Sequence, residues 1–432
     1  MLFAASSVWA AVASQFSFTA SEGYSDNIFF SKDKEHDFIT VFTPKLTLLY
    51  APPGQVVPTL NLDLSTSGEI YARNSDLTNF GKNVWLNGAY TYQYSPRLNL
   101  YVSDSLRRLG DTRTGGLAGS FQSGPTSPPT GVPSPPVSTN LNNLISRGDQ
   151  WSNWVSLHGS YLYRPDMSFT AGYSNQIVSF VDAGGTDVFH TISLRGIYNW
   201  RQEHNLHAGY SISISRSRNG DNGVIHNFDF GDDYFTNYNI QLTPTLSLAA
   251  STGLSFNTGN RGPRVANNTS ITVTKLWETA QLNAGVRKGL TPSFGVAGVS
   301  DTTSFFGNFD WRITEKFSAN SSLNFSMYDT KDVNFKTFQA SVGAQYAFTS
   351  WLSAGLAYYH NWVDSGAGAT STDLLSRGAV RSNSAFLFLT TRFDLWPNTG
   401  LARSISPSAL TPVITTPFPV QSPSKFPLPA AP

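Results

Sequence analysis

The chain has 432 residues, a formal net charge of +1 and no cysteine. A nearly neutral chain carries no electrostatic footprint for nucleic acid, and the lack of cysteine excludes disulfide frameworks, thiolate metal sites and cysteine nucleophiles. Charged residues make up only 13% of the sequence, against roughly 25% in soluble globular proteins, and aromatic residues make up another 13%. No apolar stretch reaches the roughly 18 residues that a membrane-spanning helix needs.

The first residues, "MLFAASSVWAAVASQ", predict the apolar part of a secretory signal. Ala11 and Ala13 form an A-x-A arrangement before Ser14, but the basic n-region is missing, so the start of such a signal would lie upstream. The alternative is a plain apolar leader. We expect residues 1–13 to be a signal-peptide remnant, which places the protein outside the cytoplasm.

The stretch "GAYTYQYSPRLNLYVS" alternates apolar and polar residues down one strand and up the next. Such alternation marks a strand with one face in an apolar medium. A three-residue turn over 95–97 would set Tyr94 opposite Leu98 and Tyr92 opposite Leu100, all on one face. We therefore expect a hairpin with one continuous apolar surface.

The same pattern recurs at four later turns, which follow Tyr163, Leu242, Ile313 and Phe348. In each hairpin the apolar residues that flank the turn are four apart, so both strands keep the same outward face. Longer, polar, Gly-rich connections separate these hairpins. The alternation of short turns and long loops is typical of a transmembrane β-barrel, with short periplasmic turns and long extracellular loops.

Counting strands from Phe16 to Trp396 gives about 18, an even number as expected of single-chain bacterial barrels. We therefore predict an all-β fold, an antiparallel transmembrane β-barrel of about 18 strands over residues 14–396. Pairing within residues 269–288 is the weakest part of this count, because the apolar residues there keep no phase across a short turn. A soluble β-sandwich or solenoid is the alternative, but its surface would normally carry more Lys, Glu and Asp.

Aromatic residues recur at the outward positions closest to the short turns, where a membrane interface would hold them. The opposite positions are small or polar. In hydrocarbon every backbone N–H and C=O must be paired, so such a sheet has to close, and about 18 strands leave a lumen wide enough for water. The predicted interface aromatics are Tyr50, Tyr94, Tyr163, Trp200, Trp311 and Phe348.

Charged residues on the predicted inward face are candidates for lining a pore, because rings of charge set selectivity. The alternative is that they are merely paired and solvated in the lumen. Their mixed sign favours anions only weakly. The candidates are Lys45, Asp63, Glu69, Arg107, Arg195, Arg287, Asp310, Arg312 and Arg392.

Two segments fall outside the predicted sheet. Residues 115–139 are rich in Gly, Pro and Ser and lie in the longest extracellular loop, where they would form a mobile surface arm or fold into the lumen. Residues 397–432 carry nine prolines and predict an extended tail in the periplasm.

The stretch "GYSDNIFFSKDKEHDFITVFTPKLTLLY", residues 23–50, resembles the first hairpin of the porin 2 type family of β-barrel porins. Those proteins open with Gly-Tyr-x-Asp-Asn-Ile-Phe and continue into an Asp-Phe-Ile-x-x-x-x-Pro strand. The resemblance implies a location in the Gram-negative outer membrane and a barrel architecture more firmly than it implies a cargo. The matching positions are Gly23, Tyr24, Asp26, Asn27, Ile28 and Phe29, then Asp37, Phe38, Ile39 and Pro44.

Barrels of this kind often end on a C-terminal aromatic residue that the assembly machinery reads. Here the last predicted strand, "SNSAFLFLTTRFDLW", places Phe393 and Trp396 well before the end of the chain. The chain departs from the family's usual pattern at this point.

Two groups of residues are candidates for a metal. Carboxylates of the first loop, among them Glu22, Asp26 and Asp33, suit calcium, but their spacing matches no EF-hand and a polar turn is the better interpretation. His204 and His207 form an H-x-x-H, yet without a helix the two imidazoles do not converge as zinc ligands do. No metal and no cofactor is predicted.

We expect a porin-like channel in the outer membrane of a Gram-negative bacterium, for passive or semi-selective passage of small hydrophilic solutes, oligosaccharides among them. The expected partners are outer-membrane lipid, the barrel-assembly machinery and those solutes, with no nucleic acid. The alternative is a non-conducting outer-membrane scaffold or surface-interaction protein linked to exopolysaccharide export. A third hypothesis, an outer-membrane hydrolase, lacks any local signature for its serine, so no enzyme and no catalytic residue is predicted.

Overall fold

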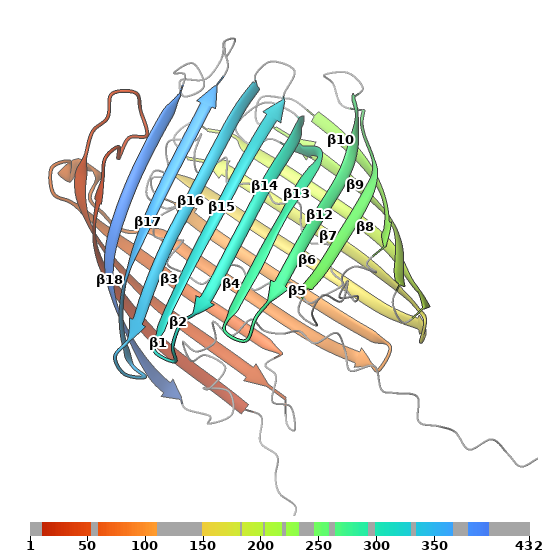
Figure 1. Ribbon diagram of the computed structural model, residues 1–432, viewed down its shortest axis with the longest axis horizontal. Helices are drawn as coiled ribbons and strands as arrows, with labels where there is room; N and C mark the ends of the chain where they lie inside the picture. The colour runs from red at the N-terminus through yellow and green to blue at the C-terminus, as the bar shows by residue number, and fades with distance from the viewer. Residues whose placement is uncertain are drawn as a thin grey trace, which may run out of the picture.

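The computed structural model describes residues 11–52, 59–109, 149–181, 184–201, 204–217, 222–232, 246–258, 264–292, 299–329, 334–365 and 379–396. Within these ranges 18 strands form one antiparallel sheet, in which each strand pairs with the next along the chain. Strand β1 also pairs with β18, so the sheet closes into a barrel of tilted strands (Figure 1). The prediction of an antiparallel barrel of about 18 strands is confirmed.

Every strand is long enough to cross a membrane, from 11 residues in β10 to 17 in β4 and β18. Besides the strands, the described ranges contain the 3-10 helix η1 (Ser75–Leu77). No helix in these ranges has the length and apolarity to cross a membrane. The strands are β1 (Ala11–Ser25), β2 (Asp37–Ala51), β3 (Leu60–Tyr71), β4 (Asn79–Ser95), β5 (Leu98–Leu109), β6 (Gln150–Arg164), β7 (Met167–Phe180), β8 (Thr186–Arg201), β9 (His204–Arg216), β10 (Asn222–Asp232), β11 (Leu246–Asn257), β12 (Arg264–Leu276), β13 (Ala280–Pro292), β14 (Val299–Arg312), β15 (Phe317–Asp329), β16 (Asn334–Ala347), β17 (Leu352–Ser365) and β18 (Val380–Trp396).

The hairpin of β4 and β5 forms as expected except at its turn. Tyr92 lies opposite Leu100 as predicted, but Ser95 and not Tyr94 lies opposite Leu98. The turn is therefore one residue shorter than predicted, and Tyr94 is the extra residue of a β-bulge. Because a bulge adds one residue to one strand, the apolar residues on both strands still share a face.

Hydroxyl side chains fix the geometry of several short turns. The Ser95 hydroxyl accepts hydrogen bonds from the backbone N–H groups two and three residues further on. Thr314 and Thr349 do the same at the turns after β14 and β16. Such local bonds are why Ser and Thr are common in turns.

The pairing of β12 with β13 corrects one expectation. Ile271 lies opposite Val286, and Val273 opposite Ala284, so the apolar residues of these strands do keep phase. The backbone N–H of Trp277 donates to the carbonyl oxygen of Ala280 at 2.8 Å, so residues 278 and 279 form the turn between the strands.

The domain limits expected from the sequence stay predictions. Strand β1 begins at Ala11, which lies opposite Ala51 of β2, so residues 11–13 form part of the first strand here. The predicted arm at 115–139 and the predicted tail at 397–432 lie outside the described residues.

Candidate functional site

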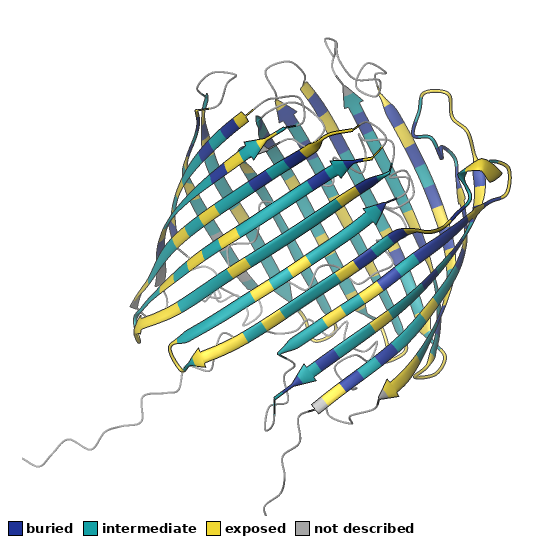
Figure 2. Ribbon diagram, turned by 180° about the vertical axis from the view of Figure 1, so that it is seen from behind, coloured by how far each residue is buried: buried dark blue, intermediate teal, exposed yellow. Residues whose placement is uncertain are grey.

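Every strand presents one row of side chains to the outside of the barrel and the next row to the inside. Residues directly opposite each other on paired strands share a face, so the register assigns each side chain. On β3 and β4, Leu62, Leu64 and Leu86 point outward, whereas Asn61 and Asp63 point inward. Figure 2 shows the result as an alternation of more and less exposed positions along the strands.

Five of the six predicted interface aromatics lie on the outward face at the short-turn rim. Their most exposed member is Tyr94, the bulge residue of the first predicted hairpin, at 69%. The side chain of Trp200 is not among those described, and the anchoring role of the set stays a prediction. The other members are Tyr50, which is half-buried, and Tyr163, Trp311 and Phe348, which are exposed.

The residues predicted to line the pore all lie on the inward face, although their role in transport stays a prediction. Two of the cations are paired: Lys45 Nζ lies 3.1 Å from Asp63 Oδ1, and Arg195 Nη2 lies 2.7 Å from Oδ2 of Asp229. The register places the full set inward: Lys45, Asp63, Glu69, Arg107, Arg195, Arg287, Asp310, Arg312 and Arg392.

Two other inward charges contact uncharged side chains. Glu69 is fully buried and accepts a hydrogen bond of 2.9 Å from Asn83 Nδ2. The Arg287 guanidinium lies over the ring of Phe306, 5.0 Å from its centroid. These contacts hold the charged groups against the wall.

Three inward cations share a single cross-strand row. Lys45 on β2 lies opposite Ser17 on β1, and Ser17 lies opposite Arg392 on β18. In the other direction, the row continues from Lys45 through β3 and β4 to Arg107 on β5. Adjacent strands are about 4.8 Å apart, so the cations follow one another at intervals of about 10 and 14 Å.

This cation row, Arg392, Lys45 and Arg107, climbs the barrel wall. Arg392 lies near the end of β18 at the short-turn rim, whereas Arg107 lies near the end of β5 at the long-loop rim. The row runs perpendicular to the strands, and the strands are tilted, so it rises as it passes round the ring (Figure 1).

Hydroxyl groups line much of the remaining inward face. They meet in cross-strand pairs, in which one hydroxyl donates to the other at 2.7 to 3.0 Å. These groups keep the capacity to bond water or a solute, because each hydroxyl has one donor and two acceptor sites. The pairs include Ser103 with Ser156, Ser251 with Ser270, Ser304 with Ser326 and Ser322 with Ser341.

Near the long-loop rim, part of the inward face is apolar, which the sequence analysis did not predict. Ile28, in the first loop (residues 26–36), is 3% exposed and packs into a buried cluster of inward side chains. Phe29 of the same loop packs against this cluster. The first loop therefore folds toward the lumen. The strand residues of the cluster are Ile39, Val41, Tyr71, Trp85, Leu109 and Phe386.

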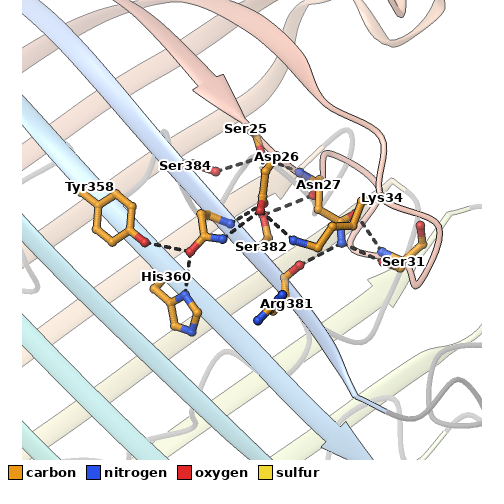
Figure 3. Close-up of polar contacts among 11 residues, drawn as sticks. Ser25, Asp26, Asn27, Ser31, Lys34, Tyr358, His360, Arg381, Ser382 and Ser384 are labelled. Atoms are coloured by element: carbon orange, nitrogen blue, oxygen red, sulfur yellow. Dashed lines mark hydrogen bonds and ion pairs between the residues drawn. The ribbon is translucent and has the colours of Figure 1, made fainter.

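The first loop is fastened to β18 through Asp26 (Figure 3). Its carboxylate accepts hydrogen bonds from the backbone N–H of Asn383 at 2.6 Å and from Asn383 Nδ2 at 2.8 Å. Lys34 Nζ lies 2.7 Å from the same carboxylate. Partial burial alone would raise the pKa of Asp26, but the hydrogen bonds from Asn383 and Lys34 hold that pKa below its ordinary value.

Asn383 extends this contact along the outer wall. Its Oδ1 accepts a hydrogen bond of 2.7 Å from the Tyr358 hydroxyl and lies 2.8 Å from Nδ1 of His360 (Figure 3). We call Asp26, Lys34 and Asn383 the first-loop latch, because they tie the loop to the strand that closes the barrel.

The remaining residues of the sequence motif also have structural partners. Asn27 Nδ2 donates to the carbonyl oxygens of Ser31 and Arg381, which shapes the loop (Figure 3). Gly23 faces Phe386 across β1 and β18, and a Cβ at this position would lie 2.1 Å from the Phe386 ring. The motif thus forms the junction between β1, the first loop and β18.

The carboxylates of the first loop and its flanking strand accept hydrogen bonds from the protein itself, so these contacts do not support the calcium alternative. Asp37, also buried, accepts hydrogen bonds from the backbone N–H groups of Phe38, Arg73 and Asn74. Across the residues that the structure describes, His, Cys, Asp and Glu form no group of three that could hold a metal.

Histidines lie on both faces of the barrel wall. The side chain of His204 is outside the description, and His207 lies inward, with Nε2 3.7 Å from Asp229 Oδ2. His190 lies outward and bonds Tyr173 and Asn175.

The barrel's own geometry defines its class. A closed ring of strands satisfies its backbone hydrogen bonds internally, and an apolar outward face with aromatics at its rim fits a lipid bilayer. The protein is a transmembrane β-barrel of the Gram-negative outer membrane, where single-chain barrels of this architecture occur.

No protein-family model and no curated protein matches this sequence. Among solved structures, the outer membrane protein OpdK of Pseudomonas aeruginosa is similar with a TM-score of 0.44 and 12% identity, over 89% of this chain and 99% of that chain. OccK2 (OpdF) of the same organism, in complex with glucuronate, has a TM-score of 0.44 and 11% identity over 89% and 98% of the two chains. OpdK with vanillate has a TM-score of 0.44 and 11% identity over 89% and 99%.

Proposed function

We propose that this protein is a porin-like channel that passes small hydrophilic solutes across the outer membrane. One observation carries the proposal: around the 18-stranded ring the inward face is lined largely by hydroxyls, amides and charges, while the outward face is apolar. Barrels of roughly 16 to 18 strands leave an aqueous channel when side chains alone do not fill them. No covalent step belongs to this function, since the solute only exchanges hydration water for lumenal groups.

The cross-strand hydroxyl pairs suggest the class of solute. Hydroxyls such as those of Ser304 and Ser326 both donate and accept, so they can replace water around a polyhydroxylated molecule. We extend the proposed solutes to short oligosaccharides on this ground.

The cation row supports a weak preference for anions. Arg107 and Arg392 have no carboxylate partner within the described residues, whereas Lys45 is paired with Asp63. A row of cations that rises from one rim toward the other offers an anion successive sites along its path, and charged side chains set selectivity in pores.

Liposome swelling tests the channel. Proteoliposomes loaded with dextran should swell in isosmotic monosaccharide, more slowly in a trisaccharide, and not in a large polysaccharide. Folded protein that gives no swelling with any sugar would overturn the proposal. It would favour the scaffold alternative, to which the first loop, folded toward the lumen with Ile28 buried, gives specific support.

Reversal potentials in a salt gradient test the anion preference. A variant with Lys45→Gln, Arg107→Gln and Arg392→Gln should shift the reversal potential toward cation selectivity. Lys336→Gln is the matched control, because Lys336 is exposed on the outward face and should leave the potential unchanged. Equal potentials for all three proteins would contradict the role given to the row.

A further inference from the structure

One charged side chain lies on the lipid-facing wall far from either rim. Asp104 is the seventh of the twelve residues of β5, and it is exposed. The register sets it opposite Gly88 on β4 and Val155 on β6, both on the outward face. Arg108, the next charge on the outward face of β5, lies near the long-loop rim and is paired with Asp149. A carboxylate at mid-depth in hydrocarbon is unfavourable and rare.

Other polar side chains gather on the same wall. Asn153 Nδ2 donates to Asp104 Oδ1 at 2.7 Å. Asn175 lies in the same cross-strand row as Asp104, with Val155 between them. We call Asp104, Asn153, Tyr173, Asn175 and His190 the outward polar patch; it spans β5 to β8.

The outward polar patch contains both an acceptor and a donor without a partner among the described residues. Among the described residues, Asn153 is the partner of the Asp104 carboxylate, and Oδ2 has none. Nδ1 of His190 lies 3.0 Å from Asn175 Nδ2, which can only donate. The proton of the neutral imidazole is therefore assigned to Nε2, a further donor without a partner in the described part of the chain.

We propose that the outward polar patch is an interface between two copies of this chain. Copies in one membrane share their orientation, so a two-fold axis along the membrane normal brings the same patch of each copy together. The patch carries both unpaired acceptors and unpaired donors, so it is complementary to itself. Polar side chains that bond across such an interface are a recognised source of association between membrane-spanning elements.

The wall beside the patch allows a close approach. Gly88 lies opposite Asp104, and Gly159 and Ala171 lie opposite each other on β6 and β7, also facing outward. Small residues of this kind let two membrane-spanning surfaces come near enough for side chains to bond. Lipid does not meet the same need, because an acyl chain offers no donor to the Asp104 carboxylate.

The chain has no cysteine, so a single introduced cysteine reports directly on this interface. Val155→Cys lies within the outward polar patch, and Val342→Cys is the control, outward and exposed on β16, ten strands further along the chain. With a short bis-maleimide applied to intact outer membranes, Val155→Cys should give covalent dimers and Val342→Cys should not. Equal yields from both variants, or reaction of Val155→Cys with a mono-maleimide without any dimer, would overturn the proposal.

A second substitution tests whether the carboxylate itself matters. Asp104→Leu in the Val155→Cys background should reduce the dimer yield at least several-fold while the barrel stays folded and heat-modifiable. Thr391→Leu, an outward polar-to-apolar change on β18, is the matched control and should leave the yield unchanged. An undiminished dimer in Asp104→Leu would contradict the role of the patch, and a folded Asp104→Leu that is only more stable would assign Asp104 to lipid instead.

Discussion

Removal of the Asp26 carboxylate should release the first loop from β18. Asp26→Ala deletes the acceptor for two N–H groups of Asn383, at 2.6 and 2.8 Å, and for Lys34 at 2.7 Å. Hydrogen bonds to a charged group contribute about 1.5–3 kcal/mol each, and an exposed ion pair at most about 1 kcal/mol. Because the Asp26 side chain is 25% exposed and that of Lys34 36%, we discount the sum to about 3 kcal/mol for local opening of the loop.

Hydrogen exchange measures this opening directly. The Ile28 backbone N–H, which donates to Glu35 at 2.8 Å, should exchange about 100-fold faster in Asp26→Ala, since about 1.4 kcal/mol corresponds to a factor of ten. Asp26→Asn keeps an acceptor for the Asn383 N–H and should show an intermediate effect. Asp33→Ala, an exposed change in the same loop, is the control. Unchanged exchange in Asp26→Ala, or an equal rise in Asp33→Ala, would refute the latch.

The pH dependence of the same amide gives an independent reading of the latch. The pKa of Asp26 in the folded protein lies below its ordinary value of 3.8. The carboxylate therefore contributes stability that is present above the ordinary value and is lost as the pH falls through the lowered one. Exchange in the native protein, corrected for its intrinsic pH dependence, should rise below about pH 4 and should not do so in Asp26→Ala.

Two further predictions concern the residues beside the latch, and urea unfolding in lipid vesicles measures both. Gly23→Val should lower the free energy of unfolding by about 1–3 kcal/mol, because the valine side chain would overlap the Phe386 ring. Its control, Ala20→Val on the outward face, should change the free energy of unfolding by no more than about 0.5 kcal/mol. Asp37→Ala should lower the free energy of unfolding by about 3–5 kcal/mol, because the backbone N–H groups of Arg73 and Asn74 lose the buried carboxylate that accepts from them. The exposed Asp76→Ala should change the free energy of unfolding by about 0.5 kcal/mol or less. Equal effects from a test variant and its control would contradict either prediction.

The architecture of the barrel could be predicted because it depends on a period of two. Alternation near Tyr92 and Leu100 identifies the outward face of a hairpin, and repeating that pattern predicts the number of strands and the inward position of Lys45 or Arg107. The exact turn could not be predicted, because a bulge at Tyr94 and a longer turn place the same residues on the same face.

The first loop shows what local pattern does not reveal. Asp26 and Asn383 are 357 positions apart, so no spacing rule connects them. The buried cluster around Ile28 could have been predicted in part from the sequence. In "DFITVF" the neighbours Phe38 and Ile39 are both apolar, so alternation fails near the long-loop rim. Loss of alternation on a strand predicts burial on both faces, here against lipid outside and the first loop inside.

Single-channel recording of the purified, refolded protein in a planar bilayer tests the central claim most directly. If the polar inward face of the 18-stranded ring encloses water, the protein will give stable conductance steps, and its reversal potential in a salt gradient will lean toward anions. A folded, heat-modifiable barrel that inserts into the bilayer and never conducts would contradict the channel and identify the protein as a scaffold.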